Sequence, residues 1–209
     1  SMADAGQYRK VRDIITADPD RKVVIVSAAG KRFSKDYKIT DLLYLCHAHS
    51  LYGVDCSQVY QMIVDRYTGI RDELGLELDL ETEFAELKQR IDNKSVTADE
   101  LASRGEYFSA KLMAAYLGFQ FIDAVDWIKF NFDGTVDQES TYEALQSQVL
   151  GLGVVIPGFY GLMPDGHIRT FSRGGSDITG ALAAAALEAD VYENWTDVSG
   201  LLVADPRIV

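Results

Sequence analysis

The sequence predicts an α/β fold, a three-layer αβα sandwich in which helices cover both faces of a mainly parallel sheet. Two observations support this prediction. Several short runs are almost continuously apolar, which is typical of strands buried inside a parallel sheet. These runs alternate with longer segments of helical periodicity. With 209 residues, of which 47% are hydrophobic, the chain is large enough to bury a core, and we expect one domain.

The first half of the chain is predicted to be helical around a single strand. Residues 22–27, KVVIVS, are apolar and β-branched and predict a buried strand. Residues 8–18 before it and 39–52 after it have helical spacing, and Thr40 is placed to cap the second helix. Residues 57–118 read as three amphipathic helices with no convincing strand, which predicts a helical region within the domain.

The second half of the chain returns to strands. The predicted strands are residues 119–125, 127–132 and 153–161, and residues 189–198 are predicted to form a strand that follows the last helix. Between them, residues 142–150 and the alanine-rich run after residue 177 read as helices.

The net charge and the cysteine content indicate which binding partners and which cellular location to expect. The net charge of −12 at pH 7 argues against nucleic acid and anionic membranes as partners. Cys46 and Cys56 are expected to be reduced thiols of a cytoplasmic protein, because neither a signal peptide nor a dense cysteine framework is visible. His47 and His49 would face different sides of a helix, so no metal site is predicted there.

The stretch FSRGGSD places two glycines between a predicted strand and a helix. Such a turn presents unpaired N–H groups and the positive end of the helix dipole, and Gly174 and Gly175 would let an anion approach the backbone. Arg173 beside them matches a carboxylate or a phosphate. The alternative is structural: a tight turn in which Ser176 caps the helix and Asp177 interacts with its dipole.

The same stretch carries a family resemblance. FSRGGSDITGALAAAAL, followed by ENWTDVSGLLVADPRIV, resembles the aspartate kinases of the amino-acid kinase family, which have an Arg-Gly-Gly-Ser-Asp loop, a Trp-Thr-Asp-Val segment and an Asp-Pro-Arg ending. VVIVSAAGKRFSKDYKITDLLYL is similar to the family's strand, serine-containing loop and Thr-capped helix, and SRGEYFSA to its Gly-Glu helix start. The resemblance runs over almost the whole chain and implies the amino-acid kinase fold.

Two departures from the family pattern concern the ends of the chain. The family begins with a strand that ends in Lys-Phe-Gly-Gly, whereas this sequence starts at SMADAGQ. The family also continues past Asp-Pro-Arg to further nucleotide-binding elements and regulatory ACT domains. The resemblance thus implies that residues 1–209 are a catalytic domain incomplete at both ends, and that a homodimer would form through the missing parts.

The resemblance implies transfer of the γ-phosphoryl group of ATP to the side-chain carboxylate of L-aspartate. The product, 4-phospho-L-aspartate, is the first intermediate towards lysine, threonine and methionine. Because a carboxylate is already ionised at neutral pH, the reaction needs no general base, and catalysis rests on positioning and charge neutralisation. Mg²⁺ is expected with ATP, but no carboxylate cluster in the sequence identifies its ligands.

The resemblance also assigns roles to individual residues. The catalytic set is Asp177, which would orient a cation, with Arg173, Gly174 and Gly175; the aspartate site is Ser27, Thr40, Glu106, Arg173 and Ser176; the nucleotide site is Thr196, Asp197 and Arg207. From the residues alone, Glu106 is better explained as an acid on a solvated turn that is favoured by the helix dipole. Thr40 could otherwise be a helix cap and Ser27 the end of a strand.

Two other functions remain open at this stage. One is a different amino-acid kinase that phosphorylates glutamate, acetylglutamate, carbamate or UMP. The other is a non-catalytic module that binds a nucleotide or an amino acid.

Overall fold

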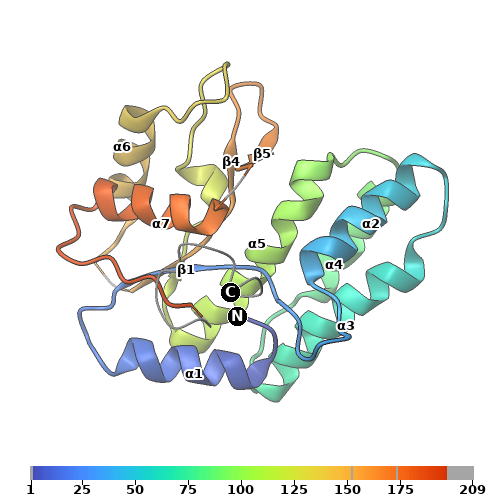
Figure 1. Ribbon diagram of the computed structural model, residues 1–209, viewed down its shortest axis with the longest axis horizontal. Coiled ribbons are helices and arrows are strands. Elements are labelled where there is room, and N and C mark those ends of the chain that lie inside the picture. The colour runs from blue at the N-terminus through green and yellow to red at the C-terminus, as the bar shows by residue number, and fades with distance from the viewer. Residues whose placement is uncertain (1, 152, 173, 197–209) are drawn as a thin grey trace, which may run out of the picture.

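The protein is described by a computed structural model that covers residues 2–151, 153–172 and 174–196 (Figure 1). Its helices are α1 (Ala5–Thr16), α2 (Ile39–Leu51), α3 (Ser57–Glu73), α4 (Glu81–Asp92), α5 (Ala98–Leu117), the 3-10 helix η1 (Ala124–Asp126), α6 (Gln138–Gln148) and α7 (Gly175–Ala186). Its strands are β1 (Val23–Val26), β2 (Gln120–Phe121), β3 (Val154–Pro157), β4 (Tyr160–Leu162) and β5 (Ile168–Thr170). None of these helices is long and apolar enough to cross a membrane.

The main sheet has the strand order β1-β3-β2, and its neighbouring strands are parallel. Val24 pairs with Val155, and Ile25 pairs with Ile156. Strands β4 and β5 form a separate antiparallel hairpin. The prediction of a mainly parallel sheet is therefore confirmed.

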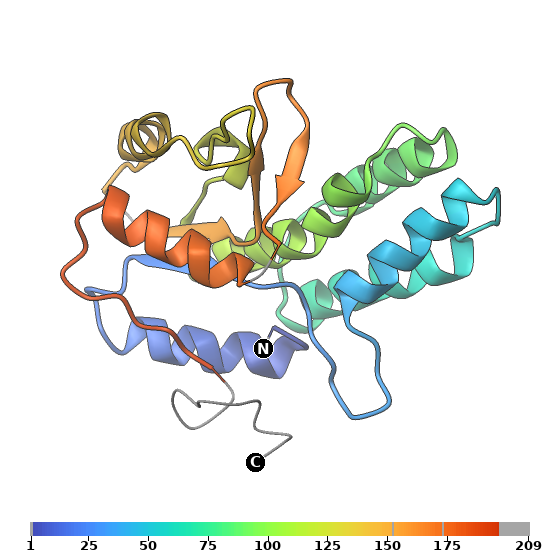
Figure 2. The ribbon, with the colours of Figure 1, turned by 45° about the horizontal axis from the view of Figure 1, so that its top comes forward.

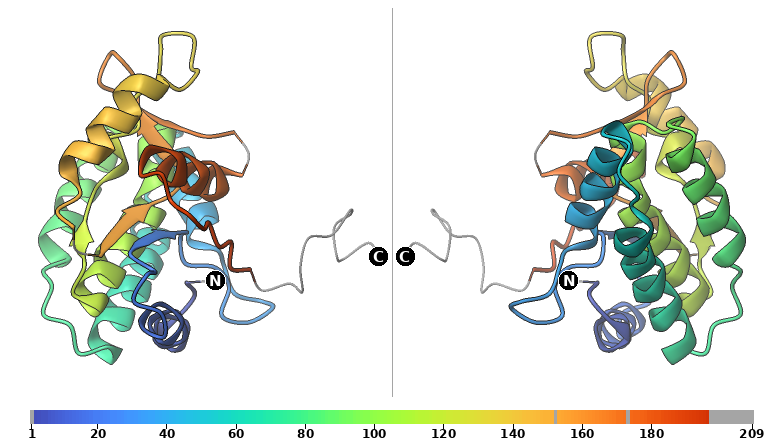
Figure 3. Two further views of the ribbon diagram at one scale, coloured as in Figure 1. Left: turned by 90° about the vertical axis from the view of Figure 1, so that its left-hand side faces the viewer. Right: turned by 90° about the vertical axis from the view of Figure 1, so that its right-hand side faces the viewer.

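Alternate residues of β1 and β3 face two different cores. Val24, Val26 and Val155 pack in the core that contains residues from α1 to α5, whereas Val154 and Ile156 pack with α6 and α7. Figure 2 shows α7 and α1 on opposite sides of β1, and Figure 3 shows α1 at one end of the molecule and the tip of the β4–β5 hairpin at the other. The three-layer arrangement expected from the sequence is confirmed.

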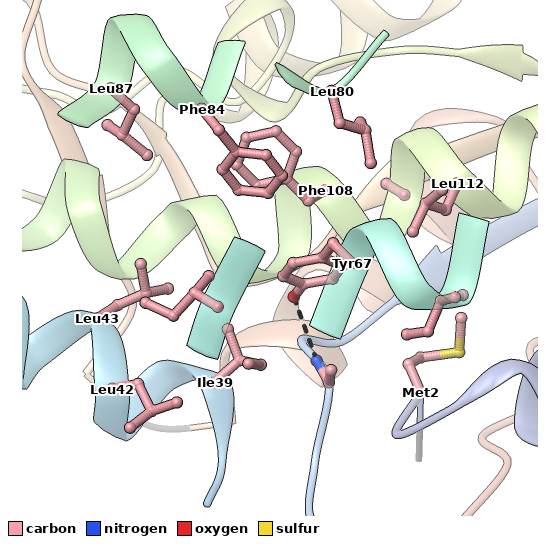
Figure 4. Packing of buried hydrophobic residues seen from close by; sticks show 14 of the residues in the cluster. Met2, Ile39, Leu42, Leu43, Tyr67, Leu80, Phe84, Leu87, Phe108 and Leu112 are labelled. Atoms are coloured by element: carbon pink, nitrogen blue, oxygen red, sulfur yellow. Dashed lines mark hydrogen bonds between the residues drawn. The ribbon is translucent and has the colours of Figure 1, made fainter. Parts of the chain in front are cut away.

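Helices α3, α4 and α5 pack through a cluster of aromatic rings in the larger core (Figure 4). Phe84 of α4 stacks on Phe108 of α5 with 4.2 Å between ring centroids. Tyr67 of α3 lies against both rings, with centroids 6.4 Å from Phe84 and 5.7 Å from Phe108. Offset and tilted ring pairs of this kind add to the hydrophobic stabilisation, so the cluster fixes α3 and α4 on α5.

Four predicted strands differ from the structure. The strand predicted at 153–161 is divided into β3 and β4, which belong to different sheets. Only Gln120 and Phe121 of residues 119–125 are in a strand, because the Asp123 side chain accepts a hydrogen bond from the Val125 N–H and starts η1.

Of residues 127–132, only Lys129 and Phe130 form isolated bridges. The described part of 189–198, residues 189–196, contains no strand. The runs at 119–125 and 127–132 are largely buried without a long strand, and periodicity alone does not separate buried coil from a strand. Residues 189–196 are exposed, so their apolar side chains reflect neither.

The loop from residue 27 to residue 38 is attached to α3 by a buried ion pair. The Arg66 Nη2 and Asp36 Oδ2 atoms are 2.7 Å apart, and both side chains are buried. Arg66 also donates to the Gly30 carbonyl at 2.8 Å, and Arg32 donates to Asp36. The hydrogen bond from Arg32 and further backbone donors hold the pKa of Asp36 well below its usual value.

Removing the charge of Asp36 should destabilise the fold. We expect Asp36→Asn to lower the free energy of unfolding at pH 7 by about 3–5 kcal/mol, because Arg66 is left buried without its counter-ion. Since the folded-state pKa is depressed, this stabilisation is present above the unfolded-state pKa and is lost as the pH falls below it. Urea unfolding at pH 7 and pH 3 measures both effects.

Arg32→Ala is the matched control, because Arg32 is 44% exposed in its side chain and contributes about 1 kcal/mol or less. Equal losses in the two variants, or an Asp36→Asn protein that matches the parent at pH 7, would contradict this account.

Candidate active site

Strands β1 and β3 end at the same edge of the sheet, and the first turn of α7 lies at this edge. The Gly158 N–H, directly after β3, donates to the Val26 carbonyl at 3.0 Å. Ser27, the first residue after β1, donates a hydrogen bond from its hydroxyl to the Ser176 Oγ at 3.0 Å. The structure therefore brings these two predicted substrate residues together, at the kind of edge where ligands bind in parallel α/β sheets.

The two glycines before α7 are required for different reasons. Gly174 caps the helix with φ 58°, and a Cβ at this position would meet no atom within 4 Å. A Cβ on Gly175 would lie 2.5 Å from the Phe159 ring and 2.9 Å from the Phe159 Cα. A ligand could therefore approach the backbone closely only at Gly174. At Gly175 the space that a side chain would need is filled by Phe159.

The start of α7 is held rigidly and its N-terminus is free of a side-chain cap. Phe159, at φ 90°, donates its N–H to the Thr179 Oγ1 at 3.1 Å, and Thr179 donates to the Gly175 carbonyl at 2.9 Å. The alternative that Ser176 caps the helix is wrong, because Gly174 is the N-cap and makes no side-chain hydrogen bond. The first N–H groups of α7 are therefore available to an anion.

Asp177 is exposed in this first turn and is contacted by the segment that follows α7. Its Oδ1 accepts a hydrogen bond from the Asn194 side chain at 3.1 Å, and Tyr192 donates to its carbonyl oxygen. This places Asp177 beside the chain that leads to Thr196, which is exposed. The other predicted residues of this region, Arg173, Asp197 and Arg207, lie outside the described residues.

Glu106 lies in the middle of α5, so its prediction at a helix start is wrong. The helix begins after Thr97, whose hydroxyl accepts from the Glu100 N–H. The alternative of a solvated acid is also wrong, because Glu106 is 6% exposed. A Cβ on Gly105 would lie 2.7 Å from the Ala28 Cβ, and this close contact places Glu106 next to the residues that follow β1.

The Glu106 carboxyl group is buried without a charge partner. Its Oε2 atom has no hydrogen-bond partner in the described protein. Burial raises the pKa of Glu106 to about 8, although the N–H groups of Glu106 and Ala28 and the charge of Arg104 act in the opposite direction. Arg104 is engaged elsewhere, with its guanidinium over the Tyr107 ring at 4.2 Å. An ammonium group brought by a ligand would supply the missing donor and charge.

Thr40 lies in the first turn of α2, close to the same loop, but it does not cap the helix. The N-cap is Lys38, with no side-chain hydrogen bond, so the predicted capping role is wrong. The Ile39 N–H donates to the Ala29 carbonyl at 3.0 Å, which holds this end of α2 beside the residues after β1.

Sequence reasoning missed Tyr44, one helical turn after Thr40. Burial raises the pKa of Tyr44, and the charges of Asp99 and Glu106 raise it further. The signal was present in the i, i+4 spacing, which puts Thr40 and Tyr44 on one side of α2.

No group of three or more His, Cys, Asp or Glu side chains that could hold a metal is found within the described ranges. Asp177 offers one exposed carboxylate at the start of α7. This donor set suits an ion such as Mg²⁺ that is held largely by phosphate oxygens and water, rather than an ion enclosed by protein ligands.

The burial of Glu106 predicts a distinctive dependence of stability on pH. Because its folded-state pKa is raised, its contribution is most favourable below pH 4.5 and declines as the pH rises to about 8. We expect Glu106→Gln to remove this decline, which amounts to up to about 5 kcal/mol. Urea unfolding between pH 4 and pH 9 measures it.

Glu100→Gln on the same helix is the control, because Glu100 is paired with Arg90 at the surface. A decline that persists unchanged in Glu106→Gln would show that another group causes it.

Comparison with known proteins agrees with this architecture. Residues 1–209 match the model of the amino acid kinase family. Aspartokinase 3 of Bacillus subtilis is 36% identical, with 100% of this chain and 49% of the relative covered. Lysine-sensitive aspartokinase 3 of Escherichia coli is 28% identical over 100% of this chain and 49% of its own length.

Two solved structures show the same fold. The aspartate kinase of Clostridium acetobutylicum superposes with a TM-score of 0.92 at 49% identity, covering 100% of this chain and 48% of that one. Aspartokinase III of E. coli in complex with aspartate and ADP gives a TM-score of 0.82 at 25% identity, covering 100% and 50%. The chain spans about half the length of these relatives, and it belongs to the amino acid kinase family.

Proposed function

We propose that the chain is the catalytic portion of an aspartate kinase, which transfers the γ-phosphoryl group of ATP to the side-chain carboxylate of L-aspartate. The observation that carries the proposal is the buried, unpartnered carboxyl group of Glu106 at the sheet edge where α7 presents its N-terminus. A cation site and an anion site on one edge suit a zwitterion. The similarity to aspartokinases over the whole chain supports the choice of aspartate.

In this proposal the amino acid is held by groups of opposite charge. Glu106 binds the ammonium, and the hydroxyls of Ser27, Thr40 and Ser176 lie on the elements around the same edge. Arg173 would clamp a substrate carboxylate, in line with the two-pronged geometry of a guanidinium. The resulting product would be 4-phospho-L-aspartate, the first intermediate towards lysine, threonine and methionine.

The phosphoryl group would be received at the start of α7. The N–H groups of Gly174, Gly175 and Ser176 neutralise charge there, and Asp177 orients a cation rather than removing a proton, because the acceptor carboxylate is already ionised. Thr196, Asp197 and Arg207 are proposed to contact ATP. Mg²⁺, when bound with ATP, would neutralise the phosphate charge further.

Residues 1–209 are proposed to form one catalytic domain, of which residues 57–118 are the helical part. A homodimer formed through other parts of the protein and a cytoplasmic location remain predictions from the sequence.

The acceptor can be identified by coupled ADP release in the intact protein that carries this chain. We expect turnover with L-aspartate and ATP, and little turnover with glutamate, N-acetylglutamate, carbamate or UMP. Asp177→Ala is expected to lower kcat by two orders of magnitude or more, a loss typical of removing one preorganised group. Preference for another acceptor would overturn the assignment of aspartate, and unchanged turnover in Asp177→Ala would remove this residue from the mechanism.

A second measurement tests the role of Glu106 in the proposed site. Glu106→Gln should raise the KM for aspartate at least tenfold, because the ammonium loses its counter-ion, while the KM for ATP changes little. Glu100→Gln again serves as the control on the same helix. Equal effects on the two KM values would show a general loss of structure instead.

A further inference from the structure

Helix α3 carries two buried tyrosines, Tyr60 and Tyr67, whose hydroxyls each donate a hydrogen bond to a backbone carbonyl of another helix. Tyr60 donates to the Phe84 carbonyl at 2.6 Å and joins α3 to α4. Tyr67, which is 0% exposed, donates to the Gly105 carbonyl at 2.7 Å and joins α3 to α5. Only the second bond reaches the residue directly before Glu106.

The Tyr67 hydroxyl also contacts the chain after β1. It accepts a hydrogen bond from the Ala29 N–H at 3.5 Å, which is the bond marked in Figure 4, and lies 3.4 Å from the Ser109 Oγ. One oxygen atom therefore links α5 at Gly105 to the loop at Ala29. These are the two stretches of backbone between which the Glu106 carboxyl group is buried.

The neighbouring residue strengthens this attachment. Arg66 donates to the Gly30 carbonyl at 2.8 Å and pairs with Asp36 further along the loop. Two consecutive residues of α3 thus hydrogen-bond to the backbone of the loop. Tyr67 accepts from the Ala29 N–H, and Arg66 donates to the Gly30 carbonyl. The position of the loop relative to α5 depends on both.

We propose that the Tyr67 hydroxyl is a positioning group that keeps Glu106 buried and aimed at the ammonium of the amino-acid substrate. It acts through the Gly105 carbonyl and the Ala29 N–H and does not touch substrate itself, because it is fully buried. This inference rests on the proposed function, in which Glu106 is the ammonium site.

The charged and titratable groups that interact with Glu106 come from three packed helices. Arg104 on α5 acts on the carboxyl group, and Glu106 in turn raises the pKa of Tyr44 on α2 and of Tyr67 on α3. Loss of the Tyr67 hydroxyl leaves the Ala29 N–H without its partner and removes a donor from the Gly105 carbonyl. Water is expected to enter and satisfy these groups, which solvates Glu106 and lowers its pKa towards the usual value.

The test compares Tyr67→Phe with Tyr60→Phe in the intact protein. Both variants lose one buried hydroxyl and should lose similar stability. In Tyr67→Phe alone, the decline of stability that the parent shows between pH 4.5 and about 8 should end at a lower pH. In Tyr67→Phe alone, the KM for aspartate should rise about tenfold with an unchanged KM for ATP, the cost of one misplaced hydrogen bond to a charge.

The outcomes separate the two proposals. The same pH profile and the same KM values in both variants would overturn the positioning role, and so would a loss of kcat alone. A parent protein without aspartate-dependent ADP release would refute the proposed function, while the pH profiles would still decide whether Tyr67 positions Glu106. Should Tyr67→Phe fail to fold, Tyr67→4-fluorophenylalanine takes its place, because the fluorine fills the space of the hydroxyl but cannot donate to the Gly105 carbonyl. A rise in the KM for aspartate then supports the role, and a KM equal to the parent value overturns it.

Discussion

The position of α5 and of Glu106 relative to the sheet depends on the contact between Gly105 in α5 and Ala28 after β1. Any side chain at position 105 would begin 2.7 Å from the Ala28 Cβ, so α5 would have to move away from the sheet edge. Glycine in a helix interior costs roughly 1 kcal/mol relative to alanine, and here that cost is offset by the close approach. The approach places Glu106 beside the end of β1, and Tyr67 and Arg66 then hold the loop over it.

A buried carboxyl group without a partner lowers stability, and such groups are concentrated at functional sites. The aromatic cluster of Tyr67, Phe84 and Phe108 joins α3, α4 and α5, and the Asp36–Arg66 pair joins α3 to the loop after β1, so both stabilise the elements around Glu106. The unpartnered Oε2 atom of Glu106 and the uncapped start of α7 make one end of the site receptive to a cation and the other to an anion. The anion site is therefore a local feature of a chain whose net charge is −12 at pH 7.

Much of the fold was predictable because its signals are local. The apolar run at 22–27 and the periodicity of residues 57–118 identified β1 and the helices α3 to α5. The run at 127–132 was mispredicted as a full strand, since most of its apolar residues are buried in the smaller core while only Lys129 and Phe130 form isolated bridges. The run predicted at 189–198 contains no strand in its described part, residues 189–196, which are exposed. The glycine turn was located correctly, although Phe159 rather than a ligand explains Gly175.

The sequence by itself determined the fold class, the positions of most elements and the family, because apolar periodicity and short motifs are properties of neighbouring residues. Tertiary structure decided that Glu106 sits inside a helix and out of water, that Thr40 is not a cap, and that Tyr44 and Tyr67 border the same site. The physical reason is that the pKa and the hydrogen bonding of a side chain depend on groups brought near it from distant parts of the chain. Residues 28, 67 and 106 meet only when β1, α3 and α5 are packed together.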